Sequence, residues 1–181
     1  MKLLIQIQYF LTCIFSSDKS VEGEAKRMTE YKRKKMLYIL NDTVKFYSKN
    51  PRKRRSVIPG TNSCKYKYVK PNGKVTKCAV GRCLEDIKDD NIYNIIEGNI
   101  WESNHMKQGL ENMFNKTPND LFKKFYKDLP GRFWEDLQNL HDNYFLWFSN
   151  EESLKKLEAS KKEIENKIID KDGYLKRSYE K

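Results

Sequence analysis

Glycine, proline, cysteine and histidine are all scarce in this chain. Its 181 residues include 8 Gly, 5 Pro, 4 Cys and 2 His. So few chain-breaking residues, together with abundant lysine, glutamate, leucine and isoleucine, favour a helix-rich fold. The chain also lacks internal repeats and low-complexity tracts, so nothing in it predicts a repeat architecture.

The cysteines lack the spacing of a disulfide framework or of a zinc motif. Thirteen residues separate Cys64 from Cys78, and four separate Cys78 from Cys83, whereas structural zinc sites use short paired spacings such as C-x2-C. Cys64, Cys78 and Cys83 are therefore only weak candidates for metal ligands, because buried cysteines usually pack as small hydrophobes. We predict no cofactor, and a reducing, cytoplasmic location.

A long apolar run is also missing. The stretch MKLLIQIQYFLTCIF at the amino terminus is too short to span a bilayer, so we predict no membrane span. It loosely matches a signal sequence, but Gln6 and Gln8 interrupt it and no A-x-A site follows. Because Met28 opens a plausible start, MTEYKRKK, residues 1–27 are a leader, an over-extended start or a helical appendage. One domain over 28–169 and a charged tail over 170–181 are expected.

Positive charge is what the chain has in excess. Its 36 basic residues outnumber 25 acidic ones, for a net charge of +11, while 38% of residues are hydrophobic and 13% aromatic. That apolar content is enough for one domain with a real core. The charge predicts attraction to polyanions such as nucleic acid or an acidic protein, although lysine-rich composition alone would also produce it.

Hydrophobic spacing predicts an α+β fold: a mostly helical single domain with one small antiparallel β-hairpin. Residues 29–48 show an apolar face at spacings of three and four, and Pro51 ends this helix. A loop over 51–63 is expected next, and further helices over 79–88, 118–126 and 133–143. The pattern over 91–114 is ambiguous. A last helix is expected to begin at Ser149, with Glu152 completing a capping box.

The hairpin is the best-specified element. Pro71-Asn72-Gly73 suits a type I turn closed by a glycine bulge, which places Tyr68 opposite Thr76 and Tyr66 opposite Cys78. Alternation then puts one set of side chains on the core face, namely Cys64, Tyr66, Tyr68, Thr76 and Cys78, and Lys65, Lys67 and Lys77 on the other.

Two kinds of site are conceivable from these residues. Cys78 could act as a nucleophile at the start of the 79–88 helix, with His141 as its base; Asp142 should not orient His141, because adjacent helical residues point apart. The basic residues instead predict phosphate contacts. Their candidates are Arg52, Lys53, Arg54, Arg55, Lys65, Lys67 and Lys77.

Several motifs together resemble a family. The succession of FYSKNPRKR, C-x-Y, a turn, CAVGRCL and FWEDLQNLHDNYFLW, before a helix capped by Ser-Asn-Glu-Glu, resembles uncharacterised small proteins encoded by phages and prophages. Their signature is a C-x-Y…CA-x-GR hairpin and an LQ-x-LHD helix, covering about residues 28–169. The resemblance implies an accessory protein in the host cytoplasm and supports a start at Met28, and it carries over no catalytic residues.

We therefore expect a small basic accessory protein that binds nucleic acid or a host macromolecule without catalysis. The alternatives are a Cys/His enzyme using Cys78 and His141, or a protein-interaction or inhibitor module whose charge is incidental. The oligomeric state is not specified by the sequence.

Overall fold

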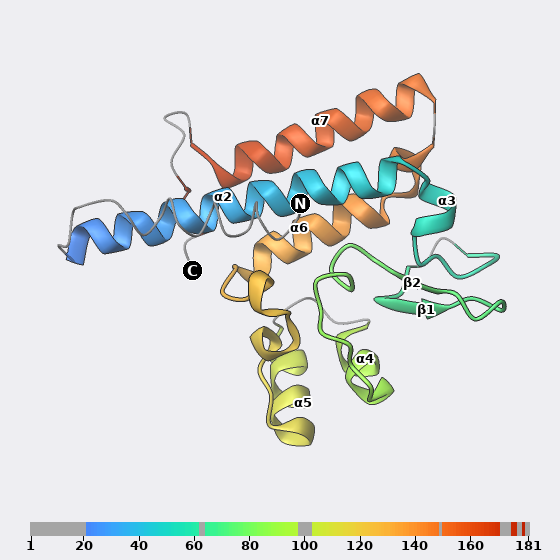
Figure 1. Cartoon of the computed structure of the whole chain (residues 1–181), viewed down its shortest axis with the longest axis horizontal. Helices are drawn as coiled ribbons and strands as arrows, with labels where there is room; N and C mark the ends of the chain where they lie inside the picture. Colours follow the sequence, from blue (N-terminus) through green and yellow to red (C-terminus); the bar gives the residue numbers. More distant parts are fainter. Residues whose placement is uncertain are drawn as a thin grey trace.

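Three helices lie lengthwise beside one another and form the body of the molecule (Figure 1). They are α2 (Val21–Ser48), α6 (Gly131–Asp142) and α7 (Glu151–Ile168). The computed structural model describes residues 21–61, 64–97, 103–148, 150–170, 175–176 and 179. The predicted mostly helical α+β domain with one hairpin is confirmed. Most of the predicted leader, residues 1–20, lies outside the described residues.

Helix α2 is longer than the sequence pattern predicted. It begins at Val21 rather than at residue 29, and its inward row of Met36, Leu40, Val44 and Tyr47 is buried. The loop predicted over 51–63 is wrong for its first four residues, because Pro51–Arg54 forms a one-turn helix, α3. Proline suits the first helical position, and the Asn50 side chain accepts a hydrogen bond from the Lys53 amide at 3.2 Å.

The hairpin has the predicted register. Strands β1 (Lys67–Val69) and β2 (Val75–Lys77) are antiparallel, with Tyr68 opposite Thr76. Gly73 has φ of 75°, which suits glycine, and the Lys70 amide donates to the Lys74 carbonyl at 2.9 Å. The predicted core face packs inward, since Tyr66, Thr76 and Cys78 are buried.

The helix predicted over 79–88 is wrong. This segment consists of turns, in which the Cys83 amide donates to the Val80 carbonyl at 2.8 Å, and Leu84 then pairs as an isolated bridge with Phe122. Gly81 lies so close under β1 that a Cβ atom would stand 2.0 Å from the Tyr66 carbonyl oxygen. This approach and the bridge replace helical pairing, although Val80 and Leu84 are buried as predicted.

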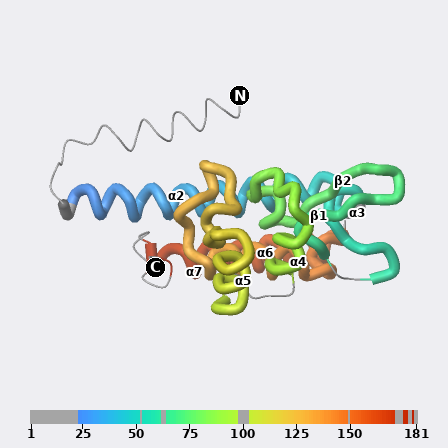
Figure 2. The backbone as a smooth tube through the Cα atoms, turned by 90° about the horizontal axis from the view of Figure 1, so that it is seen from below, coloured from blue at the N-terminus to red at the C-terminus, as the bar shows by residue number. Residues whose placement is uncertain are grey.

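Shorter elements cover the side of α2 and α6 that faces away from α7, as Figures 1 and 2 show. They are α4 (Asp90–Ile96), α5 (Asn104–Phe114), and the 3-10 turns η1 (Pro118–Leu121) and η2 (Lys124–Tyr126). The single helix predicted over 118–126 is wrong, because Phe122 is extended and pairs with Leu84. A third 3-10 turn, η3 (Tyr144–Trp147), follows α6.

The carboxyl-terminal part packs more closely than expected. Asn150, rather than Ser149, caps α7 by accepting a hydrogen bond from the Ser153 amide at 2.8 Å; Ser149 lies outside the described residues. Leu175 and Tyr179, from the predicted charged tail, are buried rather than frayed, and the Tyr179 hydroxyl donates to Asp136 of α6. Among the described helices, none is both long and apolar enough to cross a lipid bilayer.

One lysine is buried inside this helical body. Lys35 of α2 is 6% exposed, and its Nζ donates to the Lys127 carbonyl at 2.6 Å beside the rings of Tyr31 and Phe125. Burial lowers the pKa of Lys35 to about 8, although the Asp128 carboxylate opposes this shift. The charged form of Lys35 is therefore destabilised in the folded protein.

Replacing Gly81 by alanine should lower the free energy of unfolding by about 1–3 kcal/mol, the usual range for overpacking a core, because the new methyl group meets backbone. Urea denaturation would measure it. Gly109→Ala in α5 is the control: its Cβ would meet only the Ile95 side chain, at 3.2 Å. Equal losses in both variants would contradict the role given to the close approach at Gly81.

The buried Lys35 predicts a pH dependence of stability. Its pKa is lowered from 10.5 to about 8 on folding, so between these values the unfolded chain binds more protons and stability rises with pH. The difference in unfolding free energy, wild type minus Lys35→Met, should therefore increase from pH 8 to pH 10. Lys45→Met, which removes an exposed lysine from the same helix, is the control for loss of one charge. A flat curve for Lys35→Met would refute the shift.

Candidate functional site

A groove of about 950 Å³ lies where the end of α2, α3, the tip of the hairpin and η3 meet. Its charged lining residues are all basic: Lys49, Arg55 and Lys70. No acidic side chain lines it among the described residues. Aromatic rings from two separate parts of the chain complete the wall, namely Tyr68, Tyr144, Trp147 and Phe148. The groove therefore combines positive charge with flat apolar surfaces.

Arg55 is the most unusual residue of the groove. It is 4% exposed, its Nε has no hydrogen-bond partner, and none of the ion pairs among the described residues includes it. Its Nη2 donates only to weak or neutral acceptors, the Cys64 Sγ at 3.6 Å and the Asp142 carbonyl at 3.4 Å. A buried charge is unfavourable unless it is paired. An anion bound in the groove would therefore stabilise the Arg55 guanidinium.

Local structure explains why Arg55 turns inward. It caps α3, where its amide donates to the Pro51 carbonyl at 3.0 Å, and its extended backbone directs the chain back toward the body. The neighbouring Arg54 packs on the Phe46 ring and donates to the Phe46 carbonyl at 2.7 Å. The two consecutive arginines thus have different roles: Arg54 packs against α2, and Arg55 lines the groove.

Exposed aromatic rings extend from the groove along η3. Tyr144 and Phe148 are in edge contact, with ring centroids 4.6 Å apart, and Phe145 lies beside both. Phe145 is 68% exposed and Tyr144 38%, while the adjoining Trp147 is buried and its Nε1 donates to the Leu140 carbonyl at 3.2 Å. Trp147 therefore anchors a turn that presents its other rings to solvent.

The other predicted basic residues do not add free charge to one surface. Lys65, Lys67 and Lys77 each have an acidic partner, at 3.6 Å from Glu97, 3.9 Å from Asp90 and 2.9 Å from Asp86 respectively. Lys53 is exposed, whereas the side chain of Arg52 lies outside the described part. Of the six candidates whose side chains are described, Arg55 alone lines the groove. Lys49 and Lys70, which also line it, were not among the seven predicted binding residues.

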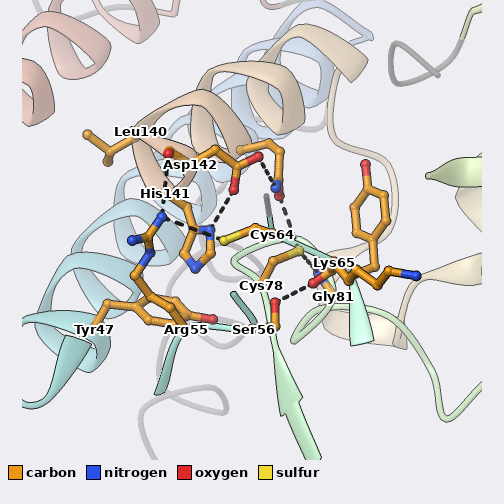
Figure 3. Close-up of polar contacts among 12 residues, drawn as sticks. Tyr47, Arg55, Ser56, Cys64, Lys65, Cys78, Gly81, Leu140, His141 and Asp142 are labelled. Atoms are coloured by element: carbon orange, nitrogen blue, oxygen red, sulfur yellow. Dashed lines mark hydrogen bonds and ion pairs between the residues drawn. The ribbon is translucent and has the colours of Figure 1, made fainter. Parts of the chain in front are cut away.

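A polar cluster around the buried His141 lies beside Arg55 (Figure 3). His141 Nδ1 is 2.9 Å from Asp142 Oδ1, so the prediction that Asp142 does not orient His141 is wrong. Asp142 is the last residue of α6, and at a helix end its carboxylate can turn back toward the preceding ring. Gln138 donates to the other carboxylate oxygen at 2.7 Å.

Cys64 rather than Cys78 lies beside His141. One ligand atom each from Cys64, His141 and Asp142 lies within 4.8 Å of the others. Cys78 is fully buried; its thiol donates to Gln138 Oε1 at 3.2 Å and accepts from the Gly81 amide at 3.2 Å. Cys83 contacts the Ala79 carbonyl. The structure therefore does not group the three predicted cysteines, and no helix begins at Cys78.

The environment keeps these groups uncharged. Burial raises the pKa of Cys78 well above its ordinary value and lowers the pKa of His141, while burial and the Asp142 carboxylate raise the pKa of Cys64 to about 12. Thiols rather than thiolates result at neutral pH. His141 Nε2 has no hydrogen-bond partner, so the Cys64 thiol is not bonded to it as a nucleophile would be to its base.

Sequence reasoning missed Gln138 and the aromatic wall, and it set Asp142 aside. Gln138 and Asp142 are four residues apart, a spacing that places side chains on one helical face, and this signal was available. Comparison of the chain with protein-family models, curated proteins and solved structures found no match. The function is therefore inferred from the residues of the groove and of the cluster.

Cys78 and Cys83 should resist alkylation in the folded protein. Because the thiolate is the reactive form, raised pKa values and burial should make both react with iodoacetamide at least about 100-fold more slowly than in urea. Peptide mass spectrometry would measure each cysteine separately. Rapid modification of Cys78 at neutral pH would contradict this and favour the Cys78/His141 enzyme.

Proposed function

We propose that the protein binds single-stranded nucleic acid in the groove, without catalysis. The observation that supports this most directly is Arg55, a buried arginine with no acidic partner among the described residues, lining a groove without acidic side chains. An anion that enters the groove would pair with this guanidinium in a site of low dielectric, where a charge-assisted hydrogen bond is strong.

The composition of the groove favours a nucleic acid over a simple anion. Lys49 and Lys70 supply further cations for successive phosphates, and the rings of Tyr68, Tyr144 and Phe148 supply faces on which bases can stack. Stacking on aromatic side chains beside a positive groove is typical of single-strand binding. Paired bases in a duplex present their edges rather than their faces, so single strands should bind better.

The finer parts of the proposal come from the sequence. The resemblance to small phage and prophage proteins and the scarcity of cysteine support an accessory protein that acts in the host cytoplasm. An acidic host protein is the competing ligand, since it would use the same cations but would not need base stacking. Removing an exposed ring therefore distinguishes the two ligands.

Binding of labelled single-stranded DNA and RNA and of duplex DNA, followed by fluorescence anisotropy across a salt series, tests the proposal. Lys49→Ala with Lys70→Ala should weaken single-strand binding and reduce the slope of log affinity against log salt by about 1.4, at about 0.7 per phosphate contact. Tyr144→Ala, which removes an exposed ring of the groove wall, should weaken it by about 1–3 kcal/mol if one base stacks there.

A matched control removes the same charge elsewhere. Lys65→Ala with Lys67→Ala also lowers the net charge by two, but both lysines already have acidic partners, so binding should change little. Equal losses in the two double variants would show unspecific attraction and contradict the groove. Absence of single-strand binding even at low salt would also contradict it, as would a Tyr144→Ala variant that binds like wild type.

A further inference from the structure

We propose that Cys64, His141 and Asp142 form a binding site for Zn²⁺. Their ligand atoms already lie within 4.8 Å of one another, and zinc bonds of about 2.0–2.3 Å place ligand atoms roughly 3.5 Å apart. Small side-chain movements therefore suffice. The site differs from the cysteine set suggested by the sequence. None of its three ligands lines the groove, although Arg55 contacts both.

The donors suit this metal. Thiolate sulfur, imidazole nitrogen and carboxylate oxygen are the three ligand types that zinc accepts, and three protein ligands leave a fourth position for water. The sequence separates Cys64 from the other two ligands, but the fold brings Cys64, which pairs with Val57 in an isolated bridge, to the end of α6. Asp142 is 40% exposed, so an ion has access from solvent.

Neighbouring side chains already form the outer shell that metal sites require. Gln138 holds the second carboxylate oxygen of Asp142 at 2.7 Å, and its own carbonyl accepts from Cys78. Such partners fix the orientation of a ligand and tune its affinity. The carboxylate is therefore held in place before any ion arrives.

His141 supplies an independent observation. Its ring is fully buried, Nδ1 faces Asp142, and Nε2 has no hydrogen-bond partner. With the proton on Nδ1, the Nε2 lone pair is buried without a donor. If Nδ1 binds the ion, the neutral ring carries its proton on Nε2 instead, and the Tyr47 ring centroid lies 4.5 Å from that of His141. An N–H over an aromatic ring is weakly favourable.

The charges balance well enough to admit a divalent cation. Binding releases one proton from the Cys64 thiol, so the ligands contribute two negative charges against two positive ones. Arg55 adds a positive charge nearby, but its Nη2 already donates to Cys64 Sγ at 3.6 Å, and such a bond would strengthen toward a thiolate. Arg55 thus acts as a further outer-shell partner.

Cobalt titration of the full chain tests this site. The chain would carry Cys13→Ser, so that its remaining cysteines are the three described here, and would be reduced and stripped of metal. One equivalent of Co²⁺ should give a thiolate-to-cobalt charge-transfer band and the visible bands of tetrahedral coordination, and Zn²⁺ should displace it. Zn²⁺ should also raise the melting temperature.

Variants separate the ligands from their surroundings. Cys64→Ser should abolish the charge-transfer band, and Asp142→Asn should weaken binding at least 10-fold. Gln138→Met should weaken it by about 10–100-fold, as loss of an outer-shell partner does. Cys83→Ser, a buried thiol outside the cluster, is the control and should bind like the parent, with circular dichroism confirming each fold.

Two results would overturn the proposal: no cobalt band in the parent chain, or a band that survives in Cys64→Ser. Equal loss in Cys64→Ser and Cys83→Ser would count against it too. If Cys64→Ser does not fold, Asp142→Asn decides, because it keeps the shape of the side chain. Nucleic-acid binding by the same metal-free chain is measured separately, so failure of either proposal leaves the other standing.

Discussion

The rest of the structure depends on a single buried tyrosine. Tyr47, near the end of α2, donates its hydroxyl to the Lys77 carbonyl at 2.6 Å and so fixes the hairpin against the helices. Its ring also makes edge contacts with His141 and Trp147, at centroid distances of 4.5 and 5.8 Å. Burial raises the pKa of Tyr47 far above its ordinary value, so the donor keeps its proton. One side chain thereby links α2, β2, α6 and η3.

Both candidate sites follow from this arrangement. Because Tyr47 holds β2 and α6 together, the turn η3 and the hairpin tip face each other across the groove, and Cys64 comes to the end of α6. Arg82 reinforces the same junction from the hairpin side, since it pairs with Asp42 at 2.9 Å and packs 3.7 Å over the Phe46 ring. Arg55 lies between the groove and the cluster, where it contacts residues of both.

Turn residues and hydrophobic spacing predicted those elements whose geometry depends on neighbouring residues in the sequence. Pro71-Asn72-Gly73 allowed a turn that fixed the hairpin register, and the inward rows of α2 and α6 followed from their spacing. The helix predicted over 79–88 was wrong because the spacing of Val80, Leu84 and Ile87 suits a helix. The close approach of Gly81 to the Tyr66 carbonyl, which prevents one, is a tertiary contact that local spacing does not reveal. Composition likewise showed a run of arginines near residue 54 but could not indicate that α3 buries one of them. The His141–Asp142 contact depended on where α6 ends.

The position of the groove walls has a consequence for assembly of the protein. Lys49, Arg55 and Lys70 come from the first half of the chain, while Tyr144, Trp147 and Phe148 come from the second. Bringing these two distant parts of the chain together has an entropic cost that slows folding, so contacts between them form late. Neither half alone presents the combined surface, so a nascent or truncated chain would not compete for the ligand. The proposed binding in the groove would thereby require completed folding, and it would report on whether the domain is intact.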